Sequence, residues 1–217
     1  MHDTLSSNPT KQVDYTHYNF QQYIIKKRWA SLWHQLNEVI SLQPETILEV
    51  GSGAGIFKHV ATLFGLHVET LDIDPDLRPD YIGTAEEIPF RDNIYNVVCA
   101  FQVLEHLPYP QAIEAFSEIH RVSKKYQIIS LPDASPVWTI SLDIPIFKTV
   151  TWHIPRPQMT PSKHVFDGEH HWEIGKKGYL LKKIIDDLSQ KSKLLKTYRV
   201  PENPYHRFFV FEKISCR

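Results

Sequence analysis

The sequence predicts an α/β protein: a seven-stranded, mostly parallel sheet with helices on both faces and an antiparallel last strand. Two observations support this prediction. Short apolar segments alternate with amphipathic ones from residue 46 to residue 131, which is typical of parallel strands joined by crossover helices. The first of these apolar segments also runs directly into a glycine-rich turn, as happens where a strand passes into a helix.

The predicted helices follow the 3.6-residue period of their apolar side chains. The first spans residues 18–41, with residues 26–28 (Lys-Lys-Arg) on its solvated face. The second runs from Ile56 to about residue 64, the third begins at Pro110, and a fourth covers residues 179–188. Together they supply the helices of the alternating pattern.

Seven segments are predicted strands: residues 46–50, 67–71, 81–82, 95–101, 126–131, 193–200 and 206–211. Residues 95–101 show little alternation, as expected for a strand that is covered on both faces. The last two segments form a terminal pair, and they complete the sheet.

Residues 133–174 interrupt this rhythm with several prolines and three tryptophans. A long insertion inside a compact domain is usually functional, so we expect it to act as a lid over a binding site. The chain is therefore divided into an N-terminal tail and capping helix (1–44), a ligand-binding core (45–132), the lid (133–174) and a C-terminal helix and strand pair (175–217) that completes the same domain.

The bulk composition argues against several classes of protein. A net charge of −1 disfavours nucleic-acid partners, whose phosphates normally select a basic surface. No stretch approaches the roughly 18 apolar residues of a membrane span, so no stable membrane insertion is expected. Cys99 and Cys216 are the two cysteines, which gives neither a disulfide framework nor a metal motif. With no leader-like N-terminus, a cytoplasmic location is expected.

The glycine-rich turn and a later acid together indicate nucleoside binding. Gly51, Gly53 and Gly55 let backbone N–H groups approach a ligand closely. Ile56 stands where a dinucleotide-binding loop needs its last glycine, so a nicotinamide oxidoreductase is disfavoured. Asp72 ends the second strand about twenty residues beyond the loop, where a carboxylate accepts from two ribose hydroxyls. Alone, the turn would indicate only helix packing.

In this order, the motifs resemble those of class I S-adenosylmethionine-dependent methyltransferases, most closely the type 11 group, which has a Rossmann-like fold. The matching segments are residues 47–55, 71–74, 83–93 and 101–107. Residues 168–179 also look like methyltransferases of bacterial surface-glycan gene clusters. The resemblance covers about residues 45–132.

The resemblance implies that S-adenosylmethionine is bound by Glu49, Gly51, Gly53, Gly55, Asp72, Ile73, Thr84, Ala85 and Gln102. Glu49 would lie near the amino group and the glycine loop along the methionine portion. Asp72 would take the ribose hydroxyls, Ile73 would flank the adenine, and Gln102 would lie under the cofactor.

The chain departs from the family pattern at two positions. Thr84 replaces the acid that many relatives use for the adenine amino group, so adenine recognition would rest on Ala85 or Glu86. Asn96 replaces an aspartate in the fourth strand. We interpret that change as structural.

Methyl transfer is an in-line displacement, and a base helps only where the acceptor must lose a proton. His170 and His171 lie between Glu169 and Glu173, and a carboxylate beside an imidazole orients such a base. We therefore expect His170 or His171 to be catalytic. The alternative is that these two residues are ordinary polar surface residues or hydrogen-bonded core residues. The same alternative applies to His106, His153, His164 and His206. No metal site is expected, because the histidines and acids match no established spacing.

The apolar residues 137–147 are interpreted as the inner wall of the lid, with contact to a lipid as the alternative. The sequence thus predicts methyl transfer to a small-molecule or glycan-type acceptor, at oxygen. Two alternatives stay open: a non-catalytic S-adenosylmethionine-binding module or regulatory subunit, and an N- or C-methyltransferase of a small metabolite. The sequence names neither the acceptor nor the oligomeric state.

Overall fold

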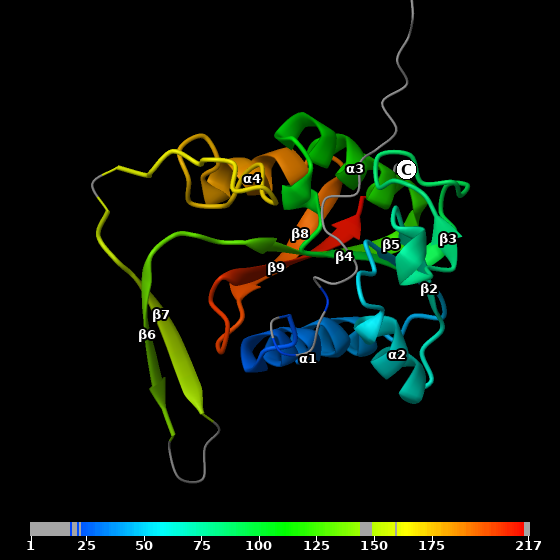
Figure 1. The fold of residues 1–217 in the computed structure, drawn as a ribbon, viewed down its shortest axis with the longest axis horizontal. Helices are drawn as coiled ribbons and strands as arrows, with labels where there is room; N and C mark the ends of the chain where they lie inside the picture. The colour runs from blue at the N-terminus through cyan, green and yellow to red at the C-terminus, as the bar shows by residue number, and fades with distance from the viewer. Residues whose placement is uncertain (1–17, 19–20, 22, 144–148, 159, 215–217) are drawn as a thin grey trace, which may run out of the picture.

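The computed structural model describes residues 18, 21, 23–143, 149–158 and 160–214. Seven strands form one sheet in the order β3-β2-β1-β4-β5-β9-β8 (Figure 1). They are β1 (Ile47–Val50), β2 (Val68–Asp72), β3 (Tyr81–Ile82), β4 (Tyr95–Phe101), β5 (Ser123–Pro132), β8 (Ser192–Arg199) and β9 (His206–Lys213). The first five are parallel, and β9 runs antiparallel between β5 and β8. The predicted seven-stranded, mostly parallel sheet is confirmed.

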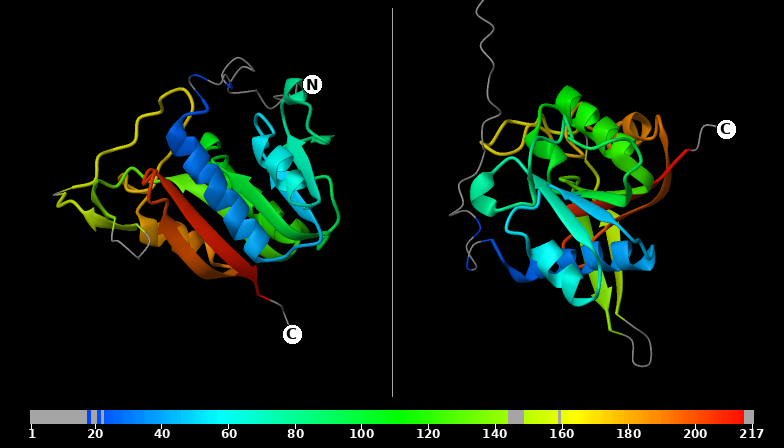
Figure 2. Two further views of the ribbon diagram at one scale, coloured as in Figure 1. Left: turned by 90° about the horizontal axis from the view of Figure 1, so that it is seen from below. Right: turned by 90° about the vertical axis from the view of Figure 1, so that its right-hand side faces the viewer.

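Helices cover both faces of the sheet. α1 (Lys26–Ser41) and α2 (Ile56–Leu63) lie on one face, and α3 (Tyr109–Val122) and α4 (Leu181–Leu188) lie on the other (Figures 1 and 2). Successive side chains of a strand point to opposite faces. Ile47, Val97 and Ile128 therefore pack with α1 and α2, whereas Leu48, Val98 and Ile129 pack with α3 and α4. This is why the central strands read as continuous apolar runs.

The first helix is shorter than its apolar pattern suggests. It begins at Lys26 and not near residue 18. Leu32, Leu36 and Val39 bury its inner face, while Trp29 and Trp33 are exposed although they continue the helical period. The apolar stripe is therefore wider than the surface that packs on the sheet.

Asn96 has the structural role expected of it. Its Oδ1 accepts from the backbone N and the Oγ1 of Thr46 at 3.0 and 2.8 Å, and its own N donates to Thr46 Oγ1 at 3.1 Å. These bonds join the residue before β1 to the start of β4, so they hold the two central strands in register.

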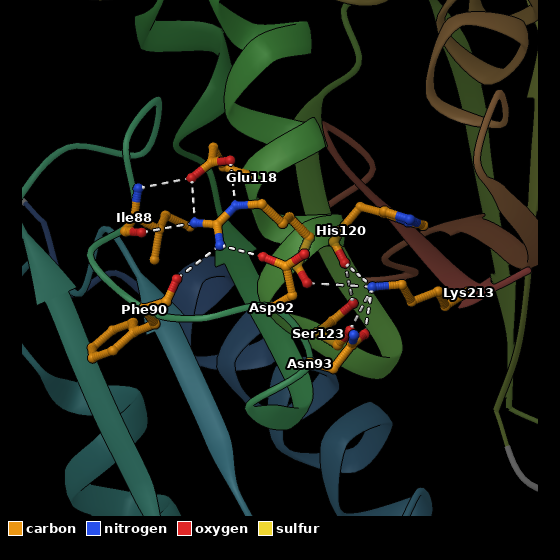
Figure 3. A network of polar contacts seen from close by, with 9 residues as sticks. Ile88, Phe90, Asp92, Asn93, Glu118, His120, Ser123 and Lys213 are labelled. Atoms are coloured by element: carbon orange, nitrogen blue, oxygen red, sulfur yellow. Dashed lines mark hydrogen bonds and ion pairs between the residues drawn. The ribbon is translucent and has the colours of Figure 1, made fainter. Parts of the chain in front are cut away.

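A polar network on the α3 side fixes the loop between β3 and β4 (Figure 3). Arg121, at the end of α3, donates to both oxygens of Glu118 and to the carbonyls of Ile88 and Phe90. Lys213, on β9, donates to the carbonyls of His120 and Arg121 at the end of α3 and to that of Ser123, where β5 begins. The network stabilises the end of the sheet that lies opposite the ligand-binding edge.

The insertion contains a separate hairpin that projects from the body (Figure 1). β6 (Val137–Leu142) pairs antiparallel with β7 (Val150–Pro155). Trp138, Ile140 and Trp152 are among its exposed apolar side chains. Residues 144–147 of the predicted wall lie outside the described residues. Within the part of the chain that is described, no helix is both long and apolar enough to cross a bilayer.

Candidate active site

A cavity of about 810 Å³ opens at the carboxyl ends of β1, β2 and β4, where open α/β sheets bind their ligands. The N-terminal part of α1 and the loops after these strands line it, together with residues 169–171, Asn203, Tyr205 and His206. Its volume suits a ligand of nucleoside size together with part of a second molecule.

The glycine loop after β1 presents bare backbone to this cavity. Gly51 has φ 72°, and a Cβ added there would lie 2.5 Å from Cγ2 of Val103. Gly53 has φ 51°, and a Cβ there would lie 3.1 Å from the ring of Tyr18. Only glycine adopts these angles freely, so glycine at both positions lets the backbone itself line the cavity. Gly55 is not a lining residue; it precedes α2 as its left-handed N-cap.

Asp72 lies at the carboxyl end of β2 and braces the glycine loop. Its Oδ2 accepts from the backbone N of Gly53 at 3.0 Å, and its Oδ1 accepts from the N of Asp74 at 3.0 Å. The side chain is nearly buried but lines the cavity. Oδ2 also accepts from Ser52 Oγ at 3.4 Å. A carboxylate has about four acceptor positions, so these three bonds leave capacity for a hydroxyl donor from a ligand.

Glu49 is a buried carboxylate at the end of β1, with 4% of its surface exposed. Its Oε2 has no hydrogen-bond partner among the described residues. Burial raises the pKa of Glu49 well above its ordinary value, the nearby Asp72 raises it further, and Lys58 opposes both effects. Because a buried charge without a partner is costly, this side chain is suited to meet a cationic group in the cavity.

The remaining positions expected to hold a cofactor also line the cavity. Ile73 follows β2, and Thr84 and Ala85 lie in the loop after β3. Gln102 has φ 57° and donates from Nε2 to Ser130 Oγ at 3.2 Å, so it is held between β4 and β5. Eight of the nine expected positions thus surround one space, Gly55 being the exception.

Histidines also line the cavity. His170 Nδ1 lies 3.4 Å from Glu173 Oε1 and 3.4 Å from the hydroxyl of Tyr205. The backbone N of His171 donates to the carbonyl of Glu105 at 2.8 Å, and its ring packs on Phe166 with centroids 4.6 Å apart. The structure therefore places both predicted catalytic histidines at the cavity, next to each other.

Two further histidines line the same cavity. His106 donates from Nδ1 to the carbonyl of Glu169 at 3.0 Å, and burial lowers the pKa of His106. His206, at the start of β9, is 6% exposed, and burial lowers its pKa to about 3. His206 is therefore neutral and can act as a hydrogen-bonding group rather than a cation.

Comparison with known proteins decides the family. A family model described as a methyltransferase domain matches residues 15–172, more than half of the chain. The chain belongs to this methyltransferase family. It is a class I enzyme that uses S-adenosylmethionine, as the motifs predicted.

Solved structures share the fold of this methyltransferase. One is a protein of Pyrococcus horikoshii with a TM-score of 0.62 and 14% identity, covering 95% of this chain and 100% of that one. Another is a Burkholderia thailandensis 1,6-didemethyltoxoflavin N1-methyltransferase with bound S-adenosylhomocysteine (TM-score 0.56, 12% identity, 87% and 78% covered). A third is the N-methyltransferase NodS of Bradyrhizobium japonicum (0.55, 10%, 91% and 94%). No functionally curated protein matches significantly.

The groups around the cavity fit the cofactor. Glu49 Oε2 lacks a partner among the described residues, as expected for a carboxylate that pairs with the amino group of S-adenosylmethionine. The exposed backbone at Gly51 and Gly53 leaves room for the methionine portion, and Asp72 retains acceptor capacity for the ribose hydroxyls.

Several lining residues of the methyltransferase were missed by the sequence interpretation. Arg28 was expected on the solvated face of its helix; Lys26 and Lys27 are indeed exposed, but Arg28 lines the cavity and lies over the ring of Tyr23 at 3.9 Å. Because α1 begins at Lys26, its first turn lies at the sheet edge. Tyr23 and Tyr205 also line the cavity, and neither carried a motif that indicated it.

The contribution of the insertion to the cavity is narrow. Only Glu169, His170 and His171 of residues 133–174 line it, as far as the chain is described. The described part of 137–147 lies in the projecting β6–β7 hairpin and is not among the lining residues. For those residues the interpretation as an inner wall is wrong, because the paired strands extend away from the sheet edge.

Proposed function

We propose that this methyltransferase methylates a hydroxyl oxygen of a small-molecule or glycan-type acceptor, with His170 or His171 as the base. The observation that supports the proposal is the position of both imidazoles at the cavity, with His170 beside the buried carboxylate of Glu173. A hydroxyl must lose its proton during transfer, and a positioned imidazole accepts it.

In this proposal one half of the cavity holds the cofactor. S-adenosylmethionine supplies a methyl group on a positively charged sulfur. Glu49 binds its amino group, Asp72 binds its ribose hydroxyls, and the backbone at Gly51 and Gly53 lies along its methionine portion. Ile73, Thr84 and Ala85 contact the adenine. Gln102, held by Ser130, lies under the cofactor.

The other half receives the acceptor. Glu173 orients His170 through Nδ1 and also accepts from the Tyr205 hydroxyl, so His170 keeps one tautomer and one direction. His171 offers a second imidazole whose ring is placed by Phe166. We infer that the lid of residues 133–174 acts through residues 169–171. Gln111 and Asn203 add polar groups that suit an acceptor with several hydroxyls.

Transfer of a labelled methyl group from S-adenosylmethionine to separate panels of sugars, phenols and amines tests this proposal. We expect hydroxyl acceptors to be used, and we expect His170→Ala or His171→Ala to lower that rate by about 10²- to 10⁴-fold, the usual contribution of a general base. His59→Ala, an exposed position outside the cavity, is the matched control.

Two outcomes would contradict the proposal. Methylation of amines alone would assign the enzyme to nitrogen chemistry, which the N-methyltransferases of similar fold make the leading alternative. Binding of S-adenosylhomocysteine without turnover on any panel would favour the alternative of a non-catalytic module.

A further inference from the structure

The fold brings Glu105, His106 and His170 into one cluster. One potential ligand atom from each side chain lies within 4.8 Å of the other two. Glu105 and His106 belong to the 3₁₀ turn Leu104–His106 after β4, whereas His170 comes from the insertion. Because His170 is distant in the sequence from Glu105 and His106, the sequence carried no metal spacing, and no metal was expected from it.

Glu105 is the unusual member of the cluster. The residue is 0% exposed, and neither carboxylate oxygen has a hydrogen-bond partner in the described part of the chain. Buried carboxylates normally have donors or bind a cation, because their desolvation is costly. An ion placed among the three side chains would give the carboxylate of Glu105 a partner.

Both histidines are held in the way that metal ligands usually are. His106 is fixed through Nδ1 by the carbonyl of Glu169 at 3.0 Å, and His170 through Nδ1 by Glu173 at 3.4 Å. Metal-bound histidines typically donate their other ring N–H to a carbonyl or a carboxylate, which fixes the tautomer and the ring direction. With Nδ1 anchored, Nε2 is the nitrogen that binds the ion.

We propose that Glu105, His106 and His170 bind a divalent transition-metal ion of the Zn²⁺ type. Two imidazoles and one carboxylate are a donor set that suits Zn²⁺ with an open fourth position. Ligand atoms about 2.0–2.2 Å from one ion lie no more than about 4.4 Å apart, so the cluster need contract only slightly.

The ion would border the acceptor end of the cavity, because His106 and His170 both line it. The next step rests on the proposed function. The open position of the ion takes an oxygen of the acceptor and polarises it. His170 is then a ligand, which leaves His171 as the base. Neither point is needed for the ion to bind.

The test is titration of chelator-treated protein with Zn²⁺ by calorimetry, and with Co²⁺ by visible absorption. We expect one ion per chain, and we expect Glu105→Gln and His170→Ala each to weaken binding at least tenfold, the scale on which even supporting residues act. The control variants His59→Ala and His171→Ala should bind the ion as the wild type does. Thermal unfolding confirms that each variant is folded.

Absence of binding at about 100 μM Zn²⁺, or unchanged binding by both ligand variants, would overturn the proposal. S-adenosylhomocysteine affinity is measured on the same samples. Cofactor binding without metal binding rejects the metal site alone, whereas metal binding without cofactor binding rejects the methyltransferase site alone.

Discussion

Replacement of Glu49 by glutamine should change cofactor binding and stability in opposite directions. In the structure the carboxylate is buried, and Oε2 has no partner in the described residues. Glutamine keeps the shape but carries no charge, so it cannot form an ion pair with an ammonium group. A hydrogen bond to a charged group contributes about 1.5–3 kcal/mol, which corresponds to a loss of about 10- to 100-fold in affinity.

The stability of the unliganded protein should behave differently. The pKa of Glu49 is raised above 4.5 by burial, so the folded state binds more protons than the unfolded state as pH rises above 4.5. The ionisation of Glu49 therefore destabilises the fold increasingly with pH, by about 1.4 kcal/mol per pH unit up to the raised pKa. Glu49→Gln should remove this penalty and be the more stable protein at neutral and higher pH.

Two measurements check this pair of effects. Calorimetric titration with S-adenosylhomocysteine gives the affinity, and urea unfolding at pH 5 to 8 gives the free energy of unfolding. Glu87→Gln, at an exposed position outside the cavity, is the control. Two results would refute the reasoning that this carboxylate binds a cationic group. One is unchanged affinity in Glu49→Gln, and the other is a Glu49→Gln protein that becomes less stable than the wild type as pH rises.

Three further predictions follow from the same geometry. Asp72→Ala should weaken S-adenosylhomocysteine binding by about 10- to 100-fold and lower the melting temperature, because Asp72 also braces Gly53; calorimetry and thermal unfolding report the two effects separately. Gly51→Ala should destabilise the fold by about 1–3 kcal/mol. The loss should exceed that of Gly65→Ala, because Gly65 also has a positive φ but a Cβ added there meets nothing within 4 Å. Equal losses of unfolding free energy in urea would exclude the contact with Val103 as the cause. The pKa of His206 is lowered from 6.5 to about 3, so its stabilising contribution is present above pH 6.5 and is lost as pH falls. Wild type should therefore lose about 2 kcal/mol more than His206→Gln between pH 7 and 5, and parallel unfolding curves for the two proteins would contradict this.

The regular elements could be predicted well because their signals are local. The segment 95–101 was predicted as a strand and forms β4 with the same bounds, since its uninterrupted apolar run requires cover on both faces. The β6–β7 hairpin was missed, although Val137–Leu142 alternates apolar and polar residues. Its flanking prolines and tryptophans obscured a period-2 pattern that the sequence does contain.

The sequence by itself determined which residues gather around the glycine loop, because strand, glycine loop and acid are adjacent in the chain and the sheet edge brings them together. Only the tertiary structure decided which side chains from other segments come together beside them. Arg28, Glu105, His170 and His206 come from four separate segments, and no local pattern records which of them will meet. Their positions depend on where α1 begins, how the insertion returns to the sheet and where β9 enters. Long-range packing sets each of these.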